Sequence, residues 1–183
     1  AVATQTESGG MPVSEITSDY DGDARNISTP DIGADEFNGI ALDITGPSII
    51  YPPLPTTLCP SDQTISAAIA DPSGVNSSAG TKPRLYFKKQ SDDNTYAGNT
   101  SADNGWKYVE ASNASSPFNF TTDYTLLQSA VVAGDVIHYF VTAQDMAPIP
   151  NIGINNGIFS AVPSSVALTA AAFPISGNFN GFT

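Results

Sequence analysis

Short apolar segments separated by turn residues follow one another from residue 46 to residue 163. In the longest segment, residues 136–143, Ile137, Tyr139, Val141 and Ala143 alternate with other side chains and fall on one face of an extended strand. Segments of this length and spacing predict an all-β sandwich with Greek-key connections. The seven predicted strands are 48–51, 64–70, 84–89, 106–110, 118–121, 136–143 and 158–162.

The two flanks of this region have a different pattern. Residues 1–40 hold short apolar pieces between turn residues, with predicted strands at 13–17 and 30–37. About forty residues of this kind cannot bury a core of their own, so this part needs a neighbour. Residues 164–183 carry strand-like pieces among small residues and are predicted to be a linker to a next module. Only residues 124–132 favour a helical turn.

The composition separates the N-terminal part further and excludes two partner classes. The net charge is −12, with six basic residues, and half of the acidic residues lie between Glu7 and Asp43. Such a chain repels phosphate backbones and anionic lipids, so nucleic acid is not expected as a partner. No apolar run approaches the roughly 20 residues that span a bilayer, so direct membrane insertion is not expected.

Cysteine usage and the start of the chain bear on the compartment. Cys59 is the single cysteine, which excludes an intrachain disulfide and favours a half-buried small apolar residue. Ala1 opens directly into polar sequence without a signal peptide, as expected of a mature or excised piece of a longer chain. Chance accounts for most of the five Asn-x-Ser/Thr sequences, which lie at Asn26, Asn76, Asn99, Asn113 and Asn119.

Two stretches of the chain resemble known proteins. Residues 19–25, Asp-Tyr-Asp-Gly-Asp-Ala-Arg, and residues 30–36, Pro-Asp-Ile-Gly-Ala-Asp-Glu, resemble the closing motif of secreted bacterial right-handed parallel β-helix proteins. Residues 69–75, 83–89 and 134–145 are similar to an immunoglobulin-like module of large Bacteroidetes-type surface proteins. The resemblance implies an immunoglobulin- or fibronectin-III-like sandwich at 46–163, preceded by the end of a β-helix at 1–40. It also implies secretion, surface attachment and tandem modules, but no catalytic activity.

The best candidate metal site is the run Asp19, Asp21 and Asp23. Carboxylates at every second position around a glycine can wrap a calcium ion. The run departs from the usual calcium loop at Ala24, where glycine is expected, and at Pro30, where a bidentate glutamate is expected. In the alternative, Arg25 pairs with one of the aspartates and the others cap the turn. No cofactor other than this possible calcium ion is expected.

Three aromatic residues are candidates for binding. Tyr96, Trp106 and Tyr108 flank a long polar loop and could stack on the rings of surface glycans, whereas the alternative makes Trp106 a core residue. His138 is the only histidine and has no cluster of partners in the sequence, which makes it a weak catalytic or metal candidate. Lys88 and Lys89 end a predicted strand, where lysines commonly protect a sheet edge.

These patterns predict a non-catalytic structural or adhesive module of a large secreted or cell-surface protein, which spaces or displays other domains. Its expected partners are neighbouring modules of the same polypeptide or further copies. One alternative is a carbohydrate-binding accessory module of a polysaccharide-degrading enzyme, which an exposed row of aromatic residues would favour. Another is a self-assembling extracellular subunit, whose sheet edges or tails would be completed by another copy.

Overall fold

The computed structural model describes residues 2–57 and 60–183. The chain divides into two compact units, Ala1–Ile44 and Thr45–Thr183. The expected half-burial of Cys59 falls outside the described residues. The described helices are two short 3-10 turns, Tyr124–Leu126 and Ala170–Ala172, and none of the described helices is long and apolar enough to cross a membrane.

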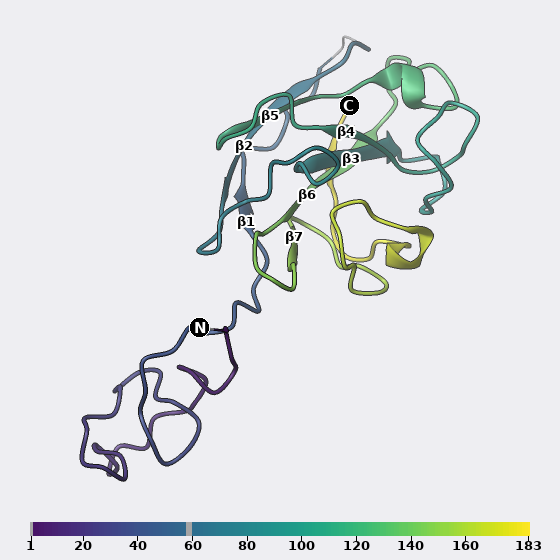
Figure 1. The fold of residues 1–183 in the computed structure, drawn as a ribbon. Helices are drawn as coiled ribbons and strands as arrows, with labels where there is room; N and C mark the ends of the chain where they lie inside the picture. Colours follow the sequence, from purple (N-terminus) through teal and green to yellow (C-terminus); the bar gives the residue numbers. More distant parts are fainter. Residues whose placement is uncertain (1, 58–59) are drawn as a thin grey trace. The chain divides into compact units, whose positions relative to one another are not determined.

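The second unit contains two antiparallel sheets and confirms the all-β prediction (Figure 1). One sheet has the strand order β1-β2-β5, and the other has the order β4-β3-β6-β7, with β8 also paired to β6. The strands of the first sheet are β1 (Ser48–Ile50), β2 (Thr64–Ala70) and β5 (Phe118–Thr121). Those of the second are β3 (Arg84–Lys89), β4 (Lys107–Glu110), β6 (Ile137–Gln144), β7 (Ile152–Ile154) and β8 (Asn180–Phe182).

The two sheets share one hydrophobic core, which gives the second unit the layering of a β-sandwich. Along β2 buried and exposed residues alternate at every position, so that Ile65, Ala67 and Ile69 face inward. The alternation predicted for residues 136–143 is confirmed, because the four predicted inward residues are buried in the same core. Phe182 of β8 completes this core at the C-terminal end of the chain.

A second apolar layer lies on the opposite face of the five-stranded sheet. All six residues of β3 are buried, so the sheet is covered on both faces. The layer is formed by aromatic side chains of the sheet and by apolar side chains from residues 164–183, which we call the C-terminal strap. Its fully or almost fully buried members are Tyr86, Trp106, Phe140, Leu168, Ala172, Phe173 and Ile175.

The strap is therefore part of the second unit, unlike the linker expected for residues 164–183. Its backbone is fixed as well as its side chains: the Tyr86 hydroxyl donates to the Val166 carbonyl at 3.3 Å and accepts from the Leu168 amide at 3.2 Å. The physical reason is that Tyr86 and Phe140 point out of the sandwich core and need an apolar cover.

The predicted strand at 158–162 is also absent. Ile158 forms only an isolated bridge with Ser176, and the strand that pairs with the end of β6 is β7. At the centre of β7 a side chain on Gly153 would collide with the Pro47 carbonyl oxygen. A glycine is required there because the chain entering the sandwich passes directly against β7.

No strand lies in residues 2–44 of the first unit, so the strands predicted at 13–17 and 30–37 are not formed. Isolated bridges join Thr4 to Ala41, in parallel, and Ser18 to Ala24. Ten of the sixteen exposed large hydrophobic side chains of the described residues belong to this unit. In contrast to these apolar side chains, Asp31 is buried. Its carboxylate accepts the amides of Ser8 at 2.6 Å and Phe37 at 2.8 Å. Side-chain bonds to the backbone thus replace strand pairing.

Candidate functional site

The Asp19 turn is stabilised by its own backbone. The Asp19 carboxylate accepts the amides of Asp21 at 3.0 Å and Asp23 at 2.8 Å through one oxygen, and that of Glu36 at 3.0 Å through the other. The amide of Glu36, followed by those of the turn, lowers the pKa of the Asp19 carboxyl. Desolvation and the nearby Asp19 carboxylate raise the pKa of Asp35. The turn is therefore closed by a capping carboxylate.

The structure does not bring Asp19, Asp21 and Asp23 together as a ligand set. They are not among the groups of three acidic side chains whose oxygens lie within 4.8 Å of one another in the described residues. Arg25 pairs with Glu36 at 3.4 Å, and it donates to the Gly33 carbonyl at 3.0 Å. The alternative in which Arg25 pairs with an aspartate of this run is thus not realised, because Glu36 takes its place. Calcium at this turn stays a prediction.

The three aromatic candidates belong to the layer beneath the strap. Trp106 is fully buried, and its indole nitrogen donates to the Asn94 side chain at 2.8 Å. Tyr96 and Tyr108 are half-buried and pack against the same cluster, with their ring centroids 6.5 Å apart. Tyr96 also stacks on Phe173 of the strap at 5.6 Å. Trp106 therefore offers no ring face to a ligand, and its burial matches the core alternative, although in the outer layer instead of the inter-sheet core.

Four of the five basic residues of the second unit are buried, and the fifth, Lys82, is partly exposed. Arg84, Lys88, Lys89 and Lys107 are each at most 6% exposed. The Lys88 ammonium donates to the backbone carbonyls of Lys89, Gln90 and Asp92 at 2.9, 3.3 and 2.8 Å, and burial lowers its pKa. Lys88 and Lys89 therefore do not protect an edge, since their strand, β3, lies inside the sheet.

His138 is a packing residue in this arrangement. Its ring lies 5.4 Å from that of Phe179, and its backbone pairs with Lys88 and Gly181. Burial, followed by the charge of Lys88, lowers the pKa of the imidazole. Its surroundings favour the neutral form and a structural role.

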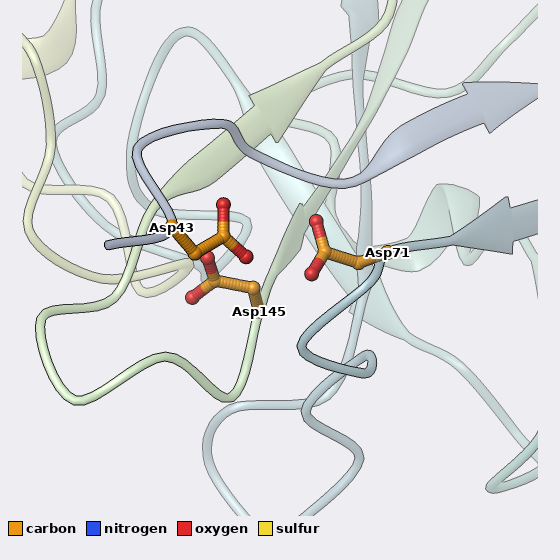
Figure 2. Close-up of side chains that lie close together, drawn as sticks. All are labelled: Asp43, Asp71 and Asp145. Carbon is orange, nitrogen blue, oxygen red and sulfur yellow. The ribbon is translucent and has the colours of Figure 1, made fainter. Parts of the chain in front are cut away.

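A carboxylate pair that the sequence analysis missed lies at the end of the sandwich where β2 and β6 end (Figure 2). Oxygens of Asp71 and Asp145 lie within 4.8 Å of each other. Asp145 is fully buried and accepts from the backbone of Asn151 at 2.9 Å and from its side chain at 2.7 Å. Asp43, the third side chain drawn in Figure 2, belongs to the first unit.

The Asp71–Asp145 pair consists of the oxygen ligands that hard cations such as calcium prefer. A signal for it is present in the sequence, because Asp71 directly follows the predicted strand 64–70 and Asp145 lies two residues after the predicted strand 136–143. Strands that run in the same direction in opposed sheets bring such residues to one end of a sandwich. The Asp71 carboxylate also accepts the Ser73 amide at 2.8 Å, which fixes the turn after β2.

Comparison of the chain with family models, with curated proteins and with solved structures gives no match.

Proposed function

We propose that the chain is a non-catalytic structural module of a large secreted or cell-surface protein, which holds the modules on its two sides apart. Its second unit is proposed to be immunoglobulin- or fibronectin-III-like. The strand order β1-β2-β5 facing β4-β3-β6-β7 supports this assignment. For the first unit, the parallel bridge between Thr4 and Ala41 supports the proposed end of a β-helix, a structure built from parallel pairs.

The observation that carries the proposal is the path of the chain through the second unit. The chain enters beside β7, where Gly46 lies against Gly153, and Gly153 pairs with Ala143 near the end of β6. Phe182 pairs with Ile137 at the start of β6. Entry and exit are thus separated by about 20 Å along one strand, at roughly 3.3 Å per residue. A module entered at one end and left at the other spaces its neighbours in line.

The burial of aromatic and lysine side chains in the second unit supports a spacer over the carbohydrate-binding alternative. Trp106 has no exposed face, and the strap covers the aromatic layer to which Tyr96 and Tyr108 belong. Lys88, Lys89 and Lys107 donate to backbone carbonyls of loops and strands. The side chains suited to recognition thus serve the fold.

Single-molecule force spectroscopy tests the spacer function. The chain is pulled through its two ends, and the second unit is expected to unfold in one event that lengthens the chain by about 48 nm, at roughly 3.6 Å per extended residue. One event is expected because β6 extends from the entry point of the chain to its exit point, is paired on both sides and is buried. Extension without a distinct rupture would contradict the proposal.

A binding assay separates the spacer from the carbohydrate alternative. The chain is mixed with insoluble cellulose, chitin and xylan, and the protein left in solution is measured. A spacer is expected to stay in solution with each polymer. Depletion by one polymer that is abolished in a Tyr108→Ala variant would favour a sugar-binding module, with Tyr20→Ala as a matched control because Tyr20 is exposed in the first unit.

A further inference from the structure

Each sheet of the sandwich has an edge strand that ends beside a long loop. β4 is the edge of the five-stranded sheet, and β5 is the edge of the three-stranded sheet. An edge strand presents unpaired backbone amides and carbonyls to which a strand of another molecule can add. Natural sheets often place lysines there, but the lysine of β4, Lys107, is buried and donates to the Gly98 carbonyl.

On β4 the outward backbone groups of Tyr108 are both occupied by one side chain. The Asn99 carboxamide accepts the Tyr108 amide at 2.7 Å and donates to the Tyr108 carbonyl at 3.1 Å. This pair of bonds has the pattern that a residue of an adjacent strand would make. Two residues before Tyr108 and just outside β4, the Trp106 amide donates to the Thr95 carbonyl at 2.9 Å. The loop that precedes β4 thus covers its edge.

On β5 a related arrangement lies at Asn119, whose amide and carbonyl are bonded by two different residues. Its amide donates to the Asn113 side chain at 2.8 Å, and its carbonyl accepts the Ser112 amide at 2.9 Å. The Asn113 carboxamide is held in place because it also donates to the carbonyls of Ser115 and Pro117, both at 2.8 Å. In both sheets an asparagine side chain from the loop before the edge strand accepts an outward amide of that strand, and on β5 Ser112 supplies the bond to the carbonyl.

We propose that Asn99 and Asn113 are edge-closing residues, which keep β4 and β5 from adding a strand of a second copy of this chain. A second copy is the relevant partner because two identical edges can pair antiparallel about a twofold axis. This role does not depend on what the module spaces, and its test does not involve force or sugar.

The test compares Asn99→Ala and Asn113→Ala with the matched control Asn104→Ala. The Asn104 carboxamide also makes three hydrogen bonds, to Asp93 and Gly105, but none of them lies on a strand edge. Sedimentation velocity is measured in about 1 M salt, where the Debye length of about 3 Å screens the repulsion between acidic copies. The parent and the Asn104 variant are expected to stay monomeric, whereas both edge variants are expected to dimerise as concentration rises.

Hydrogen exchange of single amides supplies a second measurement. The Tyr108 amide is expected to exchange about tenfold faster in dilute Asn99→Ala, because its hydrogen-bond acceptor is gone. If Asn99→Ala does not fold, Asn99→Asp retains the acceptor, loses the donor and adds a charge that about 1 M salt screens, and its dimerisation is read instead. Edge variants that stay monomeric at millimolar concentration overturn the proposal. Dimerisation of the parent or of the Asn104 variant overturns it as well.

Discussion

Replacing Leu168 by alanine tests whether the C-terminal strap is part of the domain. Leu168 is 4% exposed and belongs to the apolar layer that covers Tyr86, Trp106 and Phe140. Its amide also donates to the Tyr86 hydroxyl, a bond that alanine retains. The substitution therefore removes buried side-chain carbon atoms and leaves the backbone contact in place.

The expected loss follows from the burial of the side chain. A buried leucine replaced by alanine costs about 2–5 kcal/mol, with the larger values where the surroundings cannot relax. The strap is an outer layer with solvent on its far side, so it relaxes more readily than the core between the sheets. We therefore expect the free energy of unfolding to fall by about 2–3 kcal/mol.

Trp106 makes the measurement specific. It is the single tryptophan of the chain, and it is fully buried in the layer that Leu168 covers. Denaturant unfolding followed by its fluorescence thus reports on the second unit. Val162→Ala is the matched control, since Val162 is 94% exposed and its truncation should change the stability by less than about 0.5 kcal/mol.

Equal stability of the Leu168 variant and the parent would refute this reasoning. A linker contributes nothing to the stability of the domain before it, so residues 164–183 would then be a linker after all. A loss of about 2 kcal/mol in Leu168→Ala, with none in Val162→Ala, would establish the strap as a structural layer.

Two further substitutions test single contacts. Acidification from pH 7.5 through about 6.5 should destabilise the second unit, because the lowered pKa of His138 means that the unfolded chain takes up the proton first. His138→Phe should abolish this part of the pH dependence of the melting temperature, and an unchanged slope would exclude His138 as its source. In the first unit, Asp31→Ala should speed the hydrogen exchange of the Ser8 and Phe37 amides, which lose their acceptor, whereas Asp21→Ala should leave both unchanged.

The strands that carry a clear side-chain pattern could be predicted from the sequence. Residues 84–89 and 118–121 coincide with β3 and β5. The run Leu85-Tyr86-Phe87 also contained a signal for the second layer, because three consecutive apolar residues indicate a strand buried on both faces. The run does not show which segment of the chain covers the outer face of this strand.

The elements that were missed lack a pattern of their own. β7 is a three-residue strand with a central glycine, and β8 is Asn180-Gly181-Phe182. β7 and β8 both pair with the side of β6 that β3 leaves free, and their own short sequences do not encode this pairing. In the candidate sites, the spacing of the aspartates predicted the turn at Asp19. The pairing of Arg25 with Glu36 and of Asp145 with Asn151 could not be predicted, because it depends on the folded path of the chain between the partners.

The burial of most basic residues has a consequence for resistance to proteolysis. Trypsin-like proteases cleave after lysine and arginine, and they need an accessible, extended stretch of backbone. Four of the six basic residues of the chain, Arg84, Lys88, Lys89 and Lys107, lie in paired strands and are almost completely buried. The second unit therefore offers such enzymes almost no cleavage site until it unfolds, and its resistance to digestion follows from its folding stability.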